Sequence, residues 1–429
     1  MILSMIILYN ILIFVATILF LPIIFFKIFT HKNLKFGLKE RFTLFDKSFV
    51  KSLKNNNIIW IHASSVGEVN VSSILVKPLK KYLPDYKFLI TVMTHTGYET
   101  AYNSTIYDYV TFMPFDFSIL IKRFLKVVKP KIVLIAETEF WPNLFYFTNK
   151  KNIPILVFNC RISDNSIKNY LKFKFFFKNV LNKANFFLCQ DDDTAERLLL
   201  IGVDRKKIKI SKNIKFDFQI NISNYDTIFK DFSMENKRDC FIITAGSTHN
   251  NEEEIILDIF QKLSDKYKNL FLIIAPRHID RIDEIVKLVK NKKINFNLFS
   301  ENSVNKSSKI LLIDKLGVLI KAYAISKICF IGGSLILRGG HNPIEAIYFK
   351  KPVVSGKNIF NFKEIYSQLY EINGVILVDD ENSLKRELEK LITDQKYREI
   401  IANNGYKILE NNKGALKTTI NYIKTLLQK

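Results

Sequence analysis

The chain has 429 residues and 48% of them are hydrophobic, so it can bury a large core and is not intrinsically disordered. Its 64 Lys and Arg residues outnumber 41 acidic ones, and the net charge of +23 favours an anionic partner: nucleic acid, an anionic membrane or a phosphorylated substrate. A genome biased toward Lys, Asn and Ile is an equal explanation of that charge. Four separated cysteines and six scattered histidines argue against a disulfide framework and against a metal site.

The N-terminal segment, residues 1–26, is apolar and contains no Asp, Glu, Lys, Arg or His. As a helix rising about 1.5 Å per residue it exceeds the hydrocarbon thickness of about 30 Å. It lacks the basic start and cleavage site of a signal peptide, and basic residues such as Lys27, Lys32 and Arg41 follow it. The sequence therefore predicts a single-pass anchor over residues 1–29, with the rest of the chain on the cytoplasmic side. A buried helix of a soluble domain is the alternative.

After the anchor, β-branched and aromatic runs alternate with longer amphipathic stretches. The first set is NIIWIHAS, KFLITVMT, KIVLIAE, IPILVFNCRIS and NFFLCQ, and after a polar stretch at 217–237 the second is CFIITAGST, LFLIIAPRH, KILLID, KICFIGGS, KPVVSG and GVILVDD. This rhythm predicts an α/β fold of two doubly wound, Rossmann-like domains, at 30–220 and 221–429. Because such sheets bind ligands at the carboxyl ends of their strands, we expect activity in a cleft between the domains. A helical pattern at 382–428 predicts a packing helix pair, with the last helices able to return to the first domain.

Two acidic motifs follow strands of the first half. In WIHASSVGEV, Glu68 comes after small residues near a helix start, where a carboxylate can accept a proton from a hydroxyl nucleophile or can complement the helix dipole. In AETEFWPNLF, Glu137 and Glu139 point to the same side if the strand continues. Acid–base work and capping of the next helix are equal interpretations of that pair.

The remaining motifs suit an anion. Lys212 and Lys215 lie in SKNIKFD, a helix begins at GSTHNNEEE, and Arg277 follows a strand in APRH. Together these three motifs indicate a cleft that binds phosphate. The GxGxxG motif of a dinucleotide-binding site is missing. Glycines end the strand KICFIGGS, where missing side chains admit a ligand close to the backbone, and GGHNPIEA presents free amides with Pro343 in the first helical turn. In GGHNPIEA, Glu345 can accept hydrogen bonds from a pair of sugar hydroxyls, which predicts a nucleotide-sugar pocket.

Together these motifs resemble the Kdo transferases, the membrane-anchored 3-deoxy-D-manno-octulosonic acid transferases of lipopolysaccharide synthesis. The resemblance runs in order through SVGEV (65–69), ETEFWPNL (137–144), NCRIS (159–163), NIKFD (213–217), GSTH with EE (246–253), PRH with a following Arg281, GGS and GGHNPIE (332–345), and NF (361–362).

The resemblance implies a GT-B glycosyltransferase that needs no metal and no cofactor. It implies transfer of Kdo, with inversion, from CMP-Kdo to the lipid A precursor lipid IVA at the anionic leaflet of the cell inner membrane. It makes Glu68 the general base and makes Glu137 and Lys215 supporters of the transition state. The implied CMP-Kdo positions are Pro276, Arg277, Leu316, Gly317, Val318, Asn342, Pro343, Ile344 and Glu345.

Two departures from the family pattern stand in the second half. Val318 replaces an acidic residue of D-T-M-G-E-L, and GKNI at 356–359 replaces G-P-H-T, so we expect activity with altered donor affinity. A GT-B transferase with a UDP-sugar donor, or a silent membrane-tethered protein that binds anionic lipid, are the competing functions. No nucleic-acid recognition motif supports a nucleic-acid role. The aromatic run KFKFFFK (172–178) is either a membrane-dipping surface or a buried helix edge.

Overall fold

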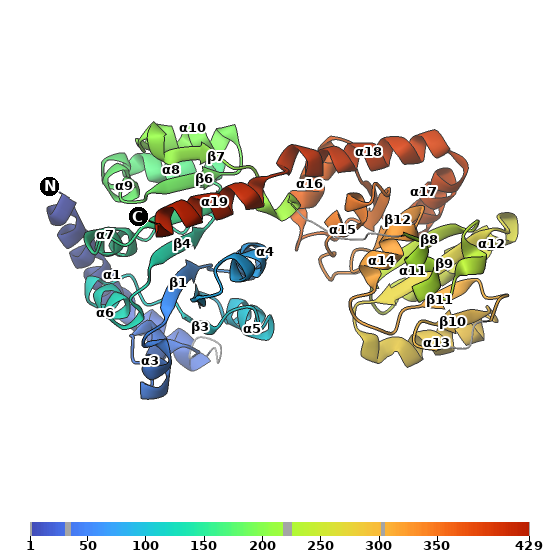
Figure 1. Ribbon diagram of the computed structural model, residues 1–429, viewed down its shortest axis with the longest axis horizontal. Helices are drawn as coiled ribbons and strands as arrows, with labels where there is room; N and C mark the ends of the chain where they lie inside the picture. The colour runs from blue at the N-terminus through green and yellow to red at the C-terminus, as the bar shows by residue number, and fades with distance from the viewer. Residues whose placement is uncertain (1, 31–35, 218–224, 302–304, 429) are drawn as a thin grey trace. The chain divides into compact units, whose positions relative to one another are not determined.

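The computed structural model describes residues 2–30, 36–217, 225–301 and 305–428. These form two compact units, Met1–Asp217 with Asn412–Lys429, and Phe218–Asn411. Each unit contains one seven-stranded sheet, and the strands within each sheet pair in parallel (Figure 1). The predicted α/β fold with two doubly wound sheets is confirmed.

The first sheet has the order β3-β2-β1-β4-β5-β6-β7. Its strands are β1 (Asn57–His62), β2 (Tyr86–Val92), β3 (Tyr109–Phe112), β4 (Ile132–Ala136), β5 (Ile155–Cys160), β6 (Phe186–Cys189) and β7 (Ile208–Ile210). The order changes direction between β1 and β4, so the connections after these two strands leave toward opposite edges. Such a switch point opens a crevice at the carboxyl ends of the two strands.

Helices cover both faces of the first sheet because its central strands are apolar on both sides. Ile58 and Trp60 of β1 pack into one cluster with residues of α6 (Ser118–Val128), α7 (Pro142–Lys150) and α9 (Lys174–Leu181). Ile59 and Ile61 pack into the other cluster with residues of α4 (Val66–Tyr82), α5 (His95–Asn103) and α19 (Ala415–Leu427). The remaining helices of this unit are α2 (Leu38–Arg41), α3 (Lys47–Leu53), α8 (Asp164–Lys172) and α10 (Asp192–Ile201).

The second sheet has the order β10-β11-β9-β8-β12-β13-β14. Its strands are β8 (Phe241–Thr248), β9 (Leu270–Pro276), β10 (Phe296–Leu298), β11 (Ile310–Leu312), β12 (Ile328–Ile331), β13 (Val353–Gly356) and β14 (Ile376–Val378). The switch point of this sheet lies between β8 and β12.

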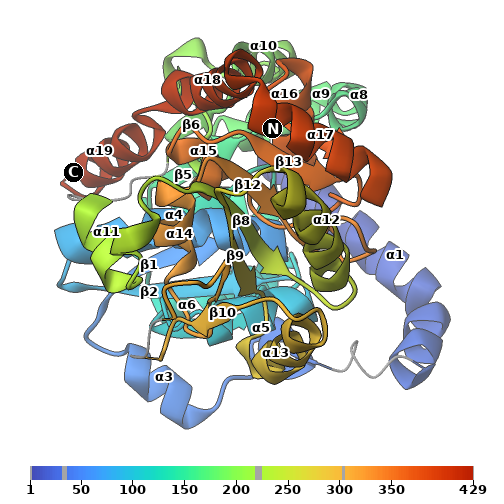
Figure 2. The same cartoon turned by 90° about the vertical axis from the view of Figure 1, so that its right-hand side faces the viewer.

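The second sheet is also covered on both faces. One core cluster joins the sheet to α12 (Glu252–Lys266), α13 (Ile282–Asn291) and α17 (Glu381–Thr393), and the other joins it to α11 (Tyr225–Asp231) and α14 (Leu319–Ile325). Figure 2 shows α12 and α13 on one side of β8 and β9, and α11 and α14 on the other. The unit also contains α15 (Ile344–Tyr348), α16 (Lys363–Glu371) and α18 (Gln395–Asn412).

The structure differs from the predicted elements at the sheet edges and at the C-terminus. The sequence prediction missed β3, β7 and β10, because YVTF, IKI and FNL are too short to form a clear apolar run. The predicted C-terminal helix pair is three helices, α17, α18 and α19. Gly414, at a φ of +91°, begins the last of them in a left-handed conformation that glycine adopts without strain.

The N-terminal helix α1 (Ile2–Thr30) contains a stretch, Ile2–Phe20, that is long and apolar enough to cross a membrane. Only 6% of that stretch is buried. Two polar side chains attach the helix to the first unit: the Tyr9 hydroxyl donates to Asp116 Oδ2 at 3.0 Å, and Asn10 Nδ2 donates to Asn143 Oδ1 at 2.9 Å. In the aromatic run nearby, Phe173 is 64% exposed whereas Phe177 packs against the core, so part of the run is a buried helix edge and its role as a membrane-dipping surface stays a prediction.

Candidate active site

Glu68 lies at the carboxyl end of β1, in the first turn of α4. Its carboxylate reaches back to the helix start, where Oε2 accepts the Ser64 N–H at 2.6 Å and Oε1 accepts the Ser65 hydroxyl at 3.2 Å. This is the contact expected of a helix cap. The side chain is nevertheless half-buried at the switch point of the sheet, so the capping contact and a chemical role are compatible.

The surroundings of Glu68 favour its protonated form. Burial, together with the charges of Glu139 and Glu137, raises the pKa of Glu68 to about 7, although the Ser64 and Ser65 hydrogen bonds act in the opposite direction. A carboxylate with a pKa near neutrality is a stronger base than an exposed one and is still deprotonated in a large fraction of molecules. Glu68 therefore has the proton affinity of a general base.

Glu137 and Glu139 follow β4, on the other side of the same switch point. Strand β4 ends before these two residues, because Glu137 has a φ of +55° and turns the chain. We expected Glu137 and Glu139 to point to the same side only if the strand continued, and it does not. A left-handed conformation at a residue other than glycine is uncommon and is concentrated at functional sites. The Lys215 Nζ lies 2.9 Å from Oε1 of Glu137, which brings two of the residues implied by the resemblance into direct contact.

Asn159, at the end of β5, connects these residues and was missed as a site residue. Its Oδ1 accepts the Ile214 N–H at 3.0 Å, which holds the short turn that carries Lys215. Its Nδ2 lies 3.5 Å from Oε1 of Glu137. Asn159 also has a positive φ, +51°, and the N-x-R-x-S motif was the signal in the sequence.

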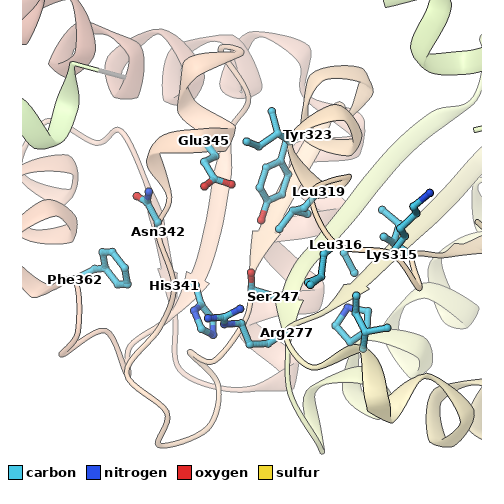
Figure 3. A pocket seen from close by; sticks show the side chains of 16 residues that line it. Ser247, Arg277, Lys315, Leu316, Leu319, Tyr323, His341, Asn342, Glu345 and Phe362 are labelled. Atoms are coloured by element: carbon cyan, nitrogen blue, oxygen red, sulfur yellow. The ribbon is translucent and has the colours of Figure 1, made fainter. Parts of the chain in front are cut away.

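The second unit contains a cavity of about 380 Å³ at the carboxyl ends of β8, β9 and β11 (Figure 3). Six of the predicted donor-binding residues line it: Pro276, Arg277, Leu316, Gly317, Asn342 and Glu345. The other three, Val318, Pro343 and Ile344, do not line the cavity and are buried. Val318 packs in an apolar core cluster with residues of α14, so the expectation of a nucleotide contact from its side chain is corrected.

The inner wall of the cavity presents polar groups that lack partners. The side chains of Glu345 and Tyr323 make no hydrogen bond with any residue that the structure describes, although Tyr323 is only 1% exposed. Burial raises the pKa of Glu345 and also raises that of Tyr323. Figure 3 shows both side chains and Ser247 pointing into the same space. Tyr323 and Ser247 were not predicted, since neither is distinctive in the sequence.

Cationic and imidazole groups gather at the cavity around Arg277 and His341. The Nε2 of His341 lies 2.9 Å from the Nε2 of His249, and the two rings are stacked within 6° of parallel. Burial and the neighbouring charges, including His278 and Arg277, lower the pKa of each of these two imidazoles to about 4. Both rings are therefore neutral at pH 7, and the arginines carry the charge that attracts an anion.

The glycine pair after β12 does not admit a ligand to its backbone, which corrects that part of the sequence interpretation. The buried carboxylate of Glu252 accepts the N–H groups of Gly333 (2.7 Å), Ser334 (3.0 Å) and Leu335 (3.0 Å). A Cβ on Gly332 would lie 2.5 Å from the Ser247 carbonyl oxygen, so this glycine permits close packing of two strand ends. Gly332, Gly333 and Glu252 are not among the residues that line the cavity.

The possible metal ligands of the described residues do not cluster. Within the described ranges, no three His, Cys, Asp or Glu side chains form a group that could hold a metal ion. The Glu253 side chain is instead paired with Arg281 through two contacts of 3.1 and 3.3 Å.

Two family descriptions cover most of the chain. Residues 37–218 match the family described as 3-deoxy-D-manno-octulosonic-acid transferase (kdotransferase), and residues 225–408 match glycosyl transferases group 1. Among curated proteins, the chain is 36% identical to the 3-deoxy-D-manno-octulosonic acid transferase of Haemophilus influenzae, over 86% of this chain and 87% of that one. It is 28% identical to the transferase of the same name from Rickettsia typhi, over 93% of this chain and 84% of that one.

Among solved structures, the chain is similar to UDP-GlcNAc 2-epimerase from Neisseria meningitidis, bound to UDP-GlcNAc. The TM-score is 0.50 at 16% identity, and the match covers 87% of this chain and all of that one. At this identity the similarity shows a shared fold.

Proposed function

Because this chain belongs to the family of 3-deoxy-D-manno-octulosonic acid (Kdo) transferases, we propose that it transfers Kdo from CMP-Kdo to the lipid A precursor lipid IVA, with inversion. It is a glycosyltransferase of lipopolysaccharide biosynthesis. The observation that carries the finer proposal is Glu68, a half-buried carboxylate with a pKa of about 7 at the β1/β4 switch point.

The proposed step is a single displacement. A hydroxyl oxygen of the acceptor attacks the anomeric carbon of Kdo and forms the new glycosidic bond. The bond from that carbon to the phosphate oxygen breaks, and CMP leaves with the electron pair. Glu68 accepts the hydroxyl proton, so that no alkoxide has to form in free solution.

Glu137 and Lys215 support this step as a pair. Lys215 is the cation and Glu137 fixes its Nζ at 2.9 Å. A lysine held in this way provides a positive charge where negative charge develops, without reorganising during the reaction. Removing Glu137 therefore affects the position of the lysine as well as the local charge.

The donor pocket is the cavity of the second unit. Its volume of about 380 Å³ suits a nucleotide-sized ligand. The carboxylate of Glu345 and the hydroxyl of Tyr323 face that space and can accept and donate hydrogen bonds to ribose hydroxyls. Arg277 stands at the cavity wall, where a guanidinium can bind the phosphate with two donors.

The membrane location is proposed on the properties of α1. Ile2–Phe20 is mostly exposed and apolar, and Lys39 and Arg41 follow in the chain. Basic residues beside an anionic leaflet contribute about 1 kcal/mol each to binding. We therefore place the protein at the cytoplasmic face of the inner membrane, where an anionic lipid acceptor is available.

The proposal is tested by incubating the purified full-length chain with CMP-Kdo and a tetraacylated lipid A precursor and weighing the lipid by mass spectrometry. We expect the lipid to gain the mass of Kdo, in parallel with a transferase of known activity. Competition of CMP and UDP for the donor pocket separates this function from a transferase with a UDP-sugar donor. A lipid of unchanged mass, or a pocket that prefers UDP, contradicts the proposal.

A further inference from the structure

One face of helix α1 is packed on the first unit. Ile6 is 2% exposed and belongs to the core cluster that includes residues of α6, α7 and α9, and Ile2 packs against that cluster. The Tyr9 ring contacts the ring of Phe176, with centroids 5.5 Å apart. Between residues 2 and 20, the side chains that are buried or half-buried recur at helical spacing, at positions 2, 5, 6, 9, 10, 13 and 17.

Asn10 contacts the N-termini of two helices of the unit. Its Oδ1 accepts the N–H of Ser118, the first residue of α6, at 3.0 Å, and Phe117 before that helix supplies no side-chain cap. Its Nδ2 donates to Asn143 Oδ1 at 2.9 Å, and Asn143 Nδ2 donates to Asn10 Oδ1 at 3.2 Å. Asn10 therefore supplies a helix N-terminus with the acceptor that its own flanking residue lacks.

The Tyr9 hydroxyl contacts the carboxylate that caps α7. Asp116 accepts the backbone N–H groups of Asn143 and Leu144, each at 3.0 Å, and its Oδ2 accepts the Tyr9 hydroxyl at 3.0 Å as well. Asp116 is almost completely buried, so Tyr9 stands where water would otherwise hydrate the carboxylate. Figure 1 shows α1 beside α6 and α7, the two helices that these polar contacts reach.

These contacts are incompatible with a helix that crosses the bilayer. If α1 crossed it, the cytoplasmic boundary would lie near Lys27, the first charged residue after the apolar segment. Asn10 would then lie roughly 25 Å from that boundary, at about 1.5 Å per residue, inside a hydrocarbon layer of about 30 Å. The start of α6, bonded to Asn10, would enter the hydrocarbon with the exposed charges of Lys122 and Arg123. Charged side chains at such a depth are rare and costly.

The rest of the α1 surface is too apolar to stay in water. No Asp, Glu, Lys, Arg or His occurs between residues 2 and 20. An exposed apolar surface of this extent marks an interaction site. Ten large apolar side chains of the helix are 46% to 70% exposed: Leu3, Ile7, Leu8, Ile11, Leu12, Phe14, Val15, Ile18, Leu19 and Phe20.

Exposed side chains beside the docked face indicate what covers this surface. Ile119, the second residue of α6, is 73% exposed, and Phe173 and Phe175, at the start of α9, are 64% and 61% exposed. Lys172 and Lys174 alternate with these phenylalanines and are exposed too. Apolar side chains with lysines among them suit the interface of an anionic bilayer, where the apolar groups reach the acyl chains and the ammonium groups meet headgroup phosphates.

We propose that α1 lies in the plane of an anionic membrane surface and does not cross it. Its Tyr9 and Asn10 face is docked on the first unit, and its remaining apolar surface enters the cytoplasmic leaflet together with Ile119, Phe173 and Phe175. This inference rests on the membrane location in the proposed function and deepens it, because the N-terminus stays on the cytoplasmic side. A helix fixed to the unit holds that unit against the leaflet in one orientation, which a flexible tether does not.

The test locates residue 4 in membranes of cells that express the full-length chain. Ser4→Cys is combined with Cys240→Ser, which removes the one native cysteine that is not buried. A thiol reagent that cannot cross membranes is added to spheroplasts, where it reaches the periplasmic face, and to inverted inner-membrane vesicles, where it reaches the cytoplasmic face. We expect labelling at position 4 in the inverted vesicles and its loss in spheroplasts. Ser48→Cys, at an exposed position of α3, is the control that is labelled only from the cytoplasmic face in either topology.

The outcomes separate this inference from the proposed function. Labelling at position 4 from the periplasmic face shows a helix that crosses the membrane, and it overturns this inference while the membrane location stands. A chain that stays in the soluble fraction, alone or as oligomers that cover α1, overturns the inference and the membrane location together. Kdo transfer is measured separately by lipid mass, so a cytoplasmic N-terminus in a chain that transfers nothing counts against the proposed activity alone.

A second measurement tests the docking of α1 directly. Asn10→Cys and Asn143→Cys are introduced as a pair in the same Cys240→Ser background, and membranes are treated with a short bifunctional thiol reagent. We expect mass spectrometry to find the two peptides joined, because the two native side chains are in hydrogen-bond contact. The control pair is Leu12→Cys with Asn143→Cys, which should stay unjoined because Leu12 is 60% exposed. Equal joining of the two pairs, or no joining of the first pair in a folded chain, overturns the docked arrangement.

Discussion

The carboxylate of Glu252, at the start of α12, accepts a 2.7 Å hydrogen bond from the backbone N–H of Gly333, which follows β12. Three further N–H groups, those of Ser334, Leu335 and His249, donate to the same carboxylate. The two strands on either side of the switch point of the second sheet are thus tied together below the cavity.

Replacing Glu252 with Gln should destabilise the protein by about 3 kcal/mol. The amide offers one acceptor oxygen and presents its own N–H groups to donors, so buried N–H groups lose their partners, at about 1–3 kcal/mol each. Denaturant unfolding of the full-length chain measures the loss. The control is Glu254→Gln in the same helical turn, which is exposed and should change the free energy of unfolding by less than about 0.5 kcal/mol. Equal effects of the two replacements contradict the assigned role of Glu252.

Replacing Glu345 with Gln should weaken CMP binding about 10- to 100-fold and leave the fold intact. A hydrogen bond to a charged group contributes about 1.5–3 kcal/mol, and the side chain of Glu345 makes no hydrogen bond within the described part of the chain that the replacement would remove. Titration calorimetry with CMP measures the affinity. Glu371→Gln, on the exposed side of α16, serves as the control and should bind CMP as the wild type does. Unchanged CMP affinity in Glu345→Gln removes this residue from the donor site.

Replacing Arg277 with Ala should weaken CMP binding and reduce its dependence on salt. Arg277 is an exposed charge at the cavity wall, and an interaction with phosphate there is screened by ions. Lys restores the charge but not the two-donor geometry, so Arg277→Lys should recover only part of the affinity. Arg205→Ala, an exposed arginine of the other unit, controls for the change in net charge. Affinity and salt dependence equal to wild type in Arg277→Ala speak against a phosphate contact.

The His249–His341 pair should make the protein less stable in acid. Each imidazole has a pKa of about 4 in the folded chain and an ordinary value of 6.5, so the unfolded chain binds these protons first as the pH falls. The contribution is complete above pH 6.5 and is lost as the pH falls toward 4. Unfolding midpoints between pH 7 and 4 should therefore decline less steeply in the double variant His249→Asn/His341→Asn than in the wild type. A slope equal to that of His95→Asn, the control, contradicts this assignment.

The sequence predicted which candidate residues lie close together where residue type and chain position suffice. Glu68, Glu137 and Lys215 occur in motifs that end strands, and the parallel topology brings strand ends together, so their meeting in the first unit follows from the pattern. The same holds for Arg277 and Asn342 at the cavity of the second unit.

The sequence failed where a role depends on contacts between distant segments. Gly332 and Gly333 suggested a backbone open to a ligand, but the Ser247 carbonyl fills the space beside Gly332, and Glu252, from a helix far away in the chain, accepts the Gly333 N–H. Val318 looked like a nucleotide contact because of its position in a motif, and its burial in the core is a matter of tertiary packing. Tyr323 has an ordinary sequence context and becomes notable only as an unpartnered hydroxyl in the cavity wall.

The central claim is that Glu68 removes the proton from the acceptor, and Glu68→Gln tests it most directly. The measurement is the rate of Kdo transfer to the tetraacylated lipid A precursor at pH 8, where the wild-type carboxylate is mostly ionised, together with the affinity for CMP. The account predicts a rate lowered by about 10²- to 10⁴-fold with CMP affinity unchanged, because the donor pocket lies in the other unit. A Glu68→Gln protein that transfers Kdo at the wild-type rate would contradict it.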